Sequence, residues 1–84
     1  MYEVYLEHAA ERDIKRLPDG IVQRIIEGLR RLSENPRPRG CRKIARSERD
    51  WRIRVGVFRV IYEIDDKDKA VRIMRVLHRK NAYR

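Results

Sequence analysis

Three arginines, Arg52, Arg54 and Arg59, alternate with apolar residues between positions 50 and 66 and are the side chains best suited to chemistry. Side chains two positions apart on a strand point to the same face, so these guanidinium groups would share one face of a two-stranded hairpin. The planar guanidinium fork binds phosphate through two parallel hydrogen bonds. The pattern therefore predicts a rigid cationic surface that binds phosphate groups.

Two alternating runs predict the hairpin that positions these arginines. Their apolar members are Trp51, Ile53 and Val55 in the first run and Phe58, Val60, Tyr62 and Ile64 in the second. Period-two alternation of β-branched and aromatic residues is typical of strands with one buried face. Gly56, between the runs, has the backbone freedom that a tight connection needs.

The rest of the chain supplies a layer for this hairpin to pack against. In chain order we expect a strand over residues 2–6, a helix from about residue 8 to Pro18, a helix capped by Asp19 that ends near residue 34, an arginine-rich connector over residues 37–49, a polar turn over residues 65–69 and a strand over residues 70–77. Gly28 inside the second helix costs roughly 1 kcal/mol relative to alanine, which indicates a close packing contact.

The order of these elements, βααβββ, predicts an α+β fold in a single domain over residues 1–84. Consecutive hairpins favour an antiparallel sheet, with a helical hairpin packed on one face and the arginines on the other. Both faces of the last strand mix apolar and charged residues, so alternation does not assign its inward side.

Positive charge is concentrated in the second half of the chain. The net charge is +9, yet residues 1–36 hold 6 Lys/Arg and 7 Asp/Glu, whereas residues 37–84 hold 16 and 6. A basic face confined to one part of a small domain is typical of a protein that binds a polyanion, usually nucleic acid. The connector over residues 37–49 is either a solvated loop or an arm that faces nucleic acid, and its composition leaves both open.

Several other classes of protein are disfavoured. Cys41 is the only cysteine, so no disulfide forms within the chain, which suits a reducing cytoplasm. The acidic N-terminus and the absence of an apolar run of about 20 residues predict a cytoplasmic protein without a membrane span. No zinc-ligand spacing is present, and Asp65, Asp66 and Asp68 lack the glycine and distal glutamate of a calcium loop. We therefore expect no metal and no cofactor.

The C-terminal residues H-R-K-N-A-Y-R offer groups for metal-free RNA cleavage. That reaction needs a base for the 2′-hydroxyl, positive charge for the phosphorane and an acid for the leaving oxygen. His78, Arg79 and Tyr83 are candidates, because nearby guanidinium groups would lower the pKa of a tyrosine from its usual value of about 10. Spacing alone favours simpler roles, in which Tyr83 packs the terminus against the sheet and His78 is a surface histidine.

Two stretches, W-R-I-R-V-G-V-F-R-V-I-Y-E-I-D-D and R-V-L-H-R-K-N-A-Y-R, carry a resemblance to a known family. The sequence resembles the RelE/ParE superfamily of toxins, on the RelE side, over nearly the whole chain. The resemblance implies a compact microbial RNase-type fold and an endoribonuclease that cleaves mRNA, commonly in the ribosomal A site. It also implies three partners: the mRNA, the ribosome at its 16S rRNA and A-site region, and a cognate antitoxin whose C-terminal segment would fold along the arginines.

By position the resemblance matches five residues to functional positions of the family: Arg52, Arg54, Arg59, Arg79 and Tyr83. We expect Arg54, Arg59, Arg79 and Tyr83 to be catalytic, with Tyr83 as the general base, and we expect RNA to be bound by Lys43, Arg52, Phe58, His78 and Lys80. The family's common G-D-Y-R is G-V-F-R here, so Phe58 can stack on a base but cannot donate a hydrogen bond.

Two functions of other classes stay open at this point. A ParE-like protein would inhibit DNA gyrase by binding, and a non-catalytic module would bind nucleic acid without cleaving it. The same fold can host all three, so fold alone does not decide among them.

Overall fold

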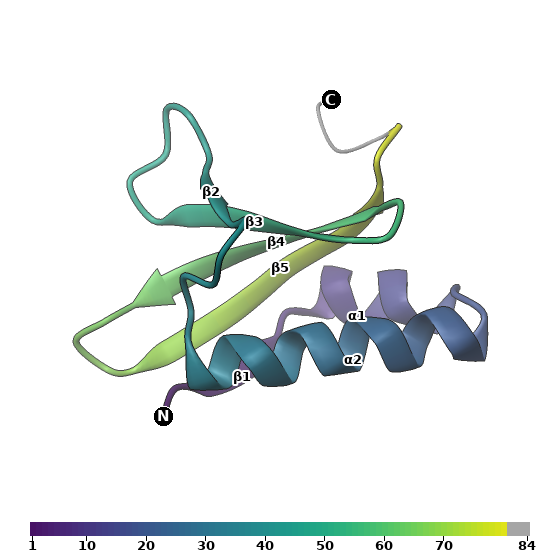
Figure 1. The fold of residues 1–84 in the computed structure, drawn as a ribbon, viewed down its shortest axis with the longest axis horizontal. Coiled ribbons are helices and arrows are strands. Elements are labelled where there is room, and N and C mark those ends of the chain that lie inside the picture. Colours follow the sequence, from purple (N-terminus) through teal and green to yellow (C-terminus); the bar gives the residue numbers. More distant parts are fainter. Residues whose placement is uncertain (81–84) are drawn as a thin grey trace.

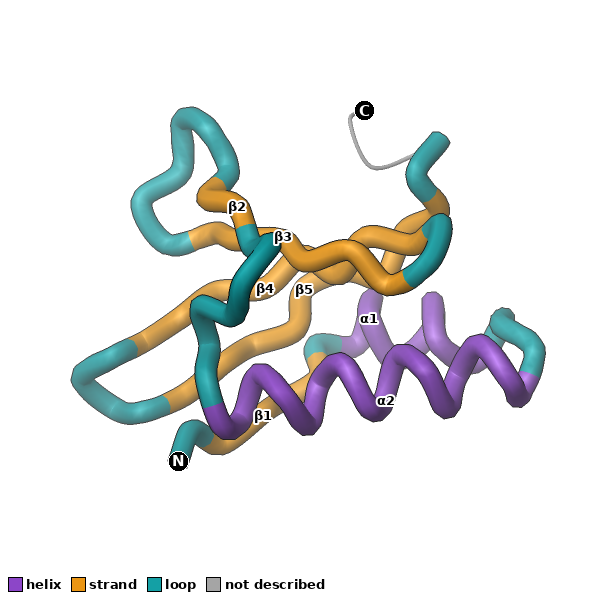
Figure 2. The backbone as a smooth tube through the Cα atoms, in the orientation of Figure 1, coloured by secondary structure: helices purple, strands orange, loops and turns teal. Residues whose placement is uncertain are grey.

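Five strands form one sheet, and two helices lie against one of its faces, as Figure 1 shows. The structure is a computed structural model that describes residues 1–80. Its elements are β1 (Glu3–Leu6), α1 (His8–Lys15), α2 (Asp19–Glu34), β2 (Arg42–Lys43), β3 (Asp50–Val55), β4 (Phe58–Asp65) and β5 (Ala70–His78). The predicted α+β fold is confirmed. One element was not expected, because β2 interrupts the loop that joins α2 to β3 (Figure 2).

The strand order across the sheet is β1-β5-β4-β3-β2. The pairs β3–β4 and β4–β5 are antiparallel, as expected. In contrast, β1 runs parallel to β5, from Glu3 opposite Ala70 to Leu6 opposite Ile73, so the prediction of a wholly antiparallel sheet is wrong at this edge. Parallel neighbours need a long connection between them, and the two helices with β2, β3 and β4 provide it here.

A bulge in β5 explains why alternation did not assign the inward face of this strand. Ile61 pairs with Arg75 but the next residue, Tyr62, pairs with Ile73, so the register passes over Met74. An extra residue of this kind moves the side chains that follow it to the opposite face. Ile73 and Val76, the buried residues on either side of the bulge, are therefore three positions apart, whereas a regular strand would separate them by an even number.

The core lies between the sheet and the helices. Its buried residues are Ala10, Ile25, Leu29, Leu32, Val60, Tyr62, Ile64, Val71, Ile73 and Val76. The Tyr62 hydroxyl donates a hydrogen bond of 2.8 Å to the carbonyl oxygen of Pro36, and burial raises the pKa of this phenol. This bond ties the start of the connector to the centre of the sheet.

The long helix α2 passes close over β3. A Cβ atom on Gly28 would lie 3.2 Å from Cγ2 of Val55 and 3.7 Å from Cδ1 of Ile53, so the predicted packing contact at Gly28 is confirmed. The predicted capping role of Asp19 is wrong, because Pro18 is the N-cap residue and Asp19 is the first helical residue. Among residues 1–80 neither helix is long and apolar enough to cross a membrane.

Asp13 of α1 holds the free edge of β5 beyond the end of β1. Its carboxylate accepts hydrogen bonds from Nε and Nη2 of Arg75, at 2.8 and 3.0 Å, and from the backbone N–H of Val76 at 2.9 Å. Burial alone would raise the pKa of Asp13, but these bonds and the charges of Arg75 and Arg16 lower it. The carboxylate therefore replaces the backbone partner that β1 no longer supplies.

Candidate nucleic-acid interface

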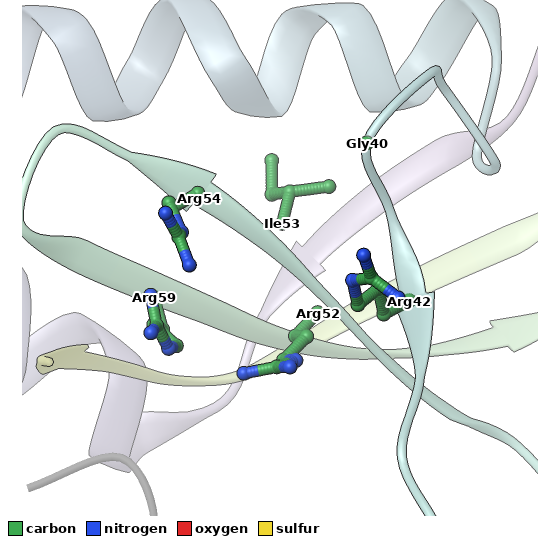
Figure 3. Close-up of a pocket in the computed structure, with 6 residues that line it drawn as sticks. All are labelled: Gly40, Arg42, Arg52, Ile53, Arg54 and Arg59. Carbon is green, nitrogen blue, oxygen red and sulfur yellow. The ribbon is translucent and has the colours of Figure 1, made fainter.

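A hollow of about 320 Å³ opens on the arginine-bearing face of the hairpin (Figure 3). The residues around it are Gly40, Arg42, Arg52, Ile53, Arg54 and Arg59. Figure 3 shows the four guanidinium groups on one side of the strands, with Ile53 turned toward the helix. Four of the six lining residues are thus arginines, and the hollow is strongly cationic.

The strand register brings the arginines together. Arg54 lies directly opposite Arg59 on β3 and β4, and Arg42 of β2 lies opposite Arg52 of β3. Residues opposite each other on neighbouring strands share a face, so the predicted common face of Arg52, Arg54 and Arg59 is confirmed. Like charges placed directly opposite destabilise a sheet. The repulsion between these like charges therefore favours the binding of an anion.

Arg59 is the most enclosed of these side chains, with only 9% of its surface exposed. Burial lowers the pKa of its guanidinium, and the charges of Arg54, Arg52 and Arg79 lower it further. At neutral pH the guanidinium is nevertheless protonated in the resting site, because its ordinary pKa is above about 12. A fixed positive charge, poorly hydrated and surrounded by like charges, gains free energy when a phosphate approaches it.

The end of β5 brings Arg79 toward this cluster. The backbone N–H of Arg79 donates a hydrogen bond of 2.7 Å to the carbonyl oxygen of Val57 in the β3–β4 turn. Its charge contributes to the lowered pKa of Arg59, so the two guanidinium groups interact. Lys80 follows as an exposed residue. Tyr83, the proposed base, lies outside the described residues.

Three of the sequence-predicted site residues lie away from the hollow. Phe58 is opposite His78 on β4 and β5, their rings meet edge-on at 5.6 Å, and Phe58 packs against the core. His78 also accepts a hydrogen bond of 3.2 Å at Nδ1 from the backbone N–H of Lys80. Lys43 is opposite Trp51, which places it on the other side of β2 from Arg42.

A family model described as the ParE toxin of type II toxin-antitoxin system, parDE, matches residues 4–83. The chain belongs to the RelE/ParE toxin family. The sequence is 33% identical to Toxin RelG of Mycobacterium tuberculosis, over 99% of this chain and 97% of that protein. The resemblance found in the sequence alone is therefore confirmed, and the chain is a toxin of a type II toxin–antitoxin system.

Solved structures of related toxins share this fold. The archaeal RelE–RelB complex from Pyrococcus horikoshii OT3 contains a chain that is 28% identical, with a TM-score of 0.84 over 96% of the toxin and 98% of that chain. The toxin–antitoxin complex RelBE2 of Mycobacterium tuberculosis contains one that is 34% identical, with a TM-score of 0.80 over 92% and 96%. Both relatives were solved with an antitoxin.

Arg42 is a lining residue of the toxin that sequence reasoning missed. The connector contains six basic residues without periodicity, so Arg42 and Lys43 could not be told apart by composition. Only the two-residue strand β2, paired with β3, separates them by turning Arg42 into the hollow and Lys43 away.

The connector of the toxin has two roles rather than one. Arg37 forms two hydrogen bonds with Asp66, at 3.1 and 2.8 Å, and its guanidinium lies over the Trp51 ring at 5.1 Å. Hydrogen bonds from Arg37 and then from Tyr2 lower the pKa of Asp66 to about 2. Arg37 is therefore a structural residue, whereas Arg42 faces the site.

The hollow can perform one chemical task from its own residues. Within residues 1–80 no three His, Cys, Asp or Glu side chains are grouped to hold a metal ion. The charged side chains that line the hollow are guanidinium groups. Donors fixed around a reacting phosphate stabilise the negative charge that develops in the transition state. The arrangement is suited to binding and neutralising a phosphodiester.

Proposed function

We propose that the toxin is an endoribonuclease that cleaves mRNA in the ribosomal A site without a metal ion and thereby inhibits translation. The observation that supports this most is the burial of Arg59 among Arg52, Arg54 and Arg79 at the edge of a cationic hollow. Fixed guanidinium groups gathered around one phosphate would stabilise the negative charge of a phosphorane, which supports catalysis as well as binding.

In the proposed reaction the 2′-oxygen attacks the adjacent phosphorus and the bond to the 5′-oxygen breaks. Tyr83 accepts the proton of the 2′-hydroxyl, while Arg54, Arg59 and Arg79 hold the phosphate and stabilise its charge. The leaving 5′-oxygen must gain a proton, from an arginine of the hollow or from His78. The contact of His78 with Phe58, on the other face of β4 from Arg59, favours an arginine.

We further propose that a cognate antitoxin inhibits the toxin in the cytoplasm by covering the arginine hollow. The related toxins from Mycobacterium tuberculosis and Pyrococcus horikoshii were solved as complexes with antitoxins. Carboxylates of a segment that folds on binding would pair with Arg52 and Arg54, which would exclude RNA from the site.

Inhibition of DNA gyrase is the second candidate function. The matching family model is described by the ParE toxin, which favours this alternative, whereas the solved relatives are RelE proteins. Gyrase-dependent DNA breaks without RNA cleavage would support it. A purely binding module is the third outcome, with salt-dependent affinity for RNA and no products.

Primer extension on an mRNA incubated with purified toxin, with and without ribosomes, tests the proposal. We expect new 5′ ends in the presence of ribosomes in a Mg²⁺ buffer, and the same ends with toxin that was treated with a chelator and desalted before mixing, because guanidinium groups do the work of a toxin-bound metal. Cleavage of free RNA would support the nuclease reaction and would show that the toxin's own surface, rather than the ribosome, selects the cleavage site. No cuts in either condition, from folded toxin, would refute the nuclease.

A matched pair of substitutions in β2 tests the geometry of the hollow. Arg42→Gln and Lys43→Gln each remove one charge from adjacent residues that face opposite ways. We expect Arg42→Gln to weaken RNA binding and to reduce its salt slope by about 0.7, the value for one phosphate contact with a single strand. Lys43→Gln should leave both nearly unchanged. Equal effects, measured by fluorescence anisotropy at several salt concentrations, would contradict the assignment.

A further inference from the structure

Two more grooves continue the arginine hollow around the edge of β3 and onto α2. A middle groove of about 170 Å³ shares Gly40, Ile53 and Arg54 with the hollow. An outer groove of about 460 Å³, between α2 and the β3–β4 turn, shares Gly28, Arg31 and Arg54 with the middle one. Arg54 lines all three, so they form one path, which we call the α2 track.

The α2 track is positively charged along its length. Arg39 lines the middle groove, Arg24 lines the outer groove and Arg31 lines both. Among residues 1–80 the carboxylate that lines the track is Glu27, which accepts hydrogen bonds from Arg30 at 2.5 and 3.3 Å, and this contact lowers its pKa. An anion in the track therefore meets guanidinium groups and a carboxylate that is already paired.

The track is open at two of the glycines that line it, because a Cβ on Gly20 or on Gly40 would meet nothing within 4 Å. The sequence contains four glycines, and all of them border the three grooves. The guanidinium of Arg24 lies over Gly56, with Nη2 3.5 Å and Nη1 3.6 Å from where a Cβ would be. A Cβ on Gly20 would meet nothing within 4 Å, so packing does not require glycine in the first turn of α2.

We propose that the α2 track binds the single-stranded RNA that flanks the scissile phosphate, so that the toxin holds several nucleotides beyond the one it cleaves. This inference rests on the proposed function. A single strand fits because Arg54 borders the hollow and both grooves, with Arg59 in the hollow and Arg24 in the outer groove, and a guanidinium fork matches phosphate oxygens. An acidic protein segment is the competing occupant, and the experiment separates the two.

The experiment measures the binding of two 2′-O-methyl oligoribonucleotides, of roughly 4 and 12 nucleotides, to the full-length toxin at several salt concentrations. Methylation removes the 2′-hydroxyl nucleophile, so the probes bind without being cleaved. The test variant is Arg24→Gln with Arg31→Gln. Its control is Arg12→Gln with Arg16→Gln, which removes the same charge from exposed positions on or beside α1 that line none of the three grooves.

We expect the unchanged toxin to bind the long probe more tightly and with a steeper salt slope than the short one. The test variant should lose about 1.4 from the salt slope of the long probe, two contacts at about 0.7 each, and should bind the short probe normally. The control variant should bind both probes slightly more weakly, and by the same factor, because only its net charge is lower.

A second pair of variants obstructs the track without removing an arginine. Gly20→Glu places a carboxylate at the open mouth of the outer groove, in a first helical turn where an acid is favourable. We expect the Gly20→Glu toxin to be at least as stable as the unchanged one and to bind the long probe more weakly. Gly20→Ala, which fills almost no space, should bind both probes normally.

Three outcomes would overturn the proposal. In the first, the test variant and the control variant bind the long probe with the same affinity. In the second, the test variant loses equal affinity for the long and the short probe. In the third, the test variant loses affinity for the antitoxin while its affinity for RNA is unchanged. A separate assay of the cleavage of unmodified RNA distinguishes a failure of this proposal from a failure of the proposed function. Cleavage without any effect of Arg24 and Arg31 refutes the track alone, whereas intact track binding without cleavage refutes the nuclease alone.

Discussion

Replacing Arg59 with glutamine should lower the cleavage rate about 10²–10³-fold, the usual effect of removing one preorganised donor from a developing oxyanion. The unfolding temperature should stay close to that of the unchanged toxin. Burial and the charges of Arg54, Arg52 and Arg79 lower the pKa of Arg59, so losing the charge removes a repulsion that offsets the loss of the contacts this side chain makes. Glutamine removes the charge and keeps a hydrogen-bond donor.

Arg75→Gln is the contrasting variant, because Arg75 stabilises the fold and lines no part of the hollow. Its guanidinium pairs with Asp13, whose side chain is only 10% exposed. Leaving such a carboxylate without its arginine costs about 1–3 kcal/mol. We expect a lower unfolding temperature and an unchanged cleavage rate per folded molecule.

The two variants together separate chemistry from folding. Calorimetry gives the unfolding temperatures, and primer extension below the lower of them gives the rates. An Arg59→Gln toxin that unfolds early and cleaves at the normal rate would show that Arg59 is a structural residue. The proposed function would then lose its main support.

The central hairpin could be predicted from sequence because the alternation is regular within each of its two strands. Trp51, Ile53 and Val55 in β3 and Phe58, Val60, Tyr62 and Ile64 in β4 face the core on either side of the turn at Gly56, and the structure keeps this register. The positions of Arg54 and Arg59 follow from it directly. Local periodicity therefore determined both the strands and the core of the candidate site.

Features that depend on distant contacts could not be predicted in this way. The bulge at Met74 reverses the alternation of β5, and no local signal indicates it. The parallel pairing of β1 depends on where the last strand arrives. The separation of Arg42 from Lys43 depends on two ladder pairs between β2 and β3.

The α2 track shows a signal that was present in the sequence and was not used. Gly20, Arg24, Gly28 and Arg31 follow one another at spacings of four, four and three, which is one face of a helix. The prediction of this helix used Gly28 only as a sign of close packing and did not connect it with Arg24. The function of this helix face can be inferred only from the structure, in which Arg54 of β3 lines the same groove as Arg24 and Arg31 and also lines the hollow.

Replacing Tyr83 with phenylalanine should reduce cleavage by about 10²–10⁴-fold, the usual contribution of a general base, and should abolish toxicity. The substitution removes one oxygen and keeps the ring, so any packing role of the side chain is preserved. The unfolding temperature and the affinity for the non-cleavable short probe should therefore match those of the unchanged toxin. Single-turnover cleavage of mRNA on ribosomes measures the rate.

The pH dependence of cleavage distinguishes a base from a residue that only packs. A base acts in its deprotonated form, so the rate of the unchanged toxin should rise about tenfold per pH unit below the pKa of the Tyr83 phenol and then level off. Because guanidinium groups would hold that pKa below the usual value of about 10, the plateau should begin below pH 10. Removing the positive charge of Arg54, with Arg54→Gln, should move the plateau to higher pH. A Tyr83→Phe toxin that cleaves at the normal rate, or a plateau that Arg54→Gln does not move, would contradict this role and assign the proton to another group.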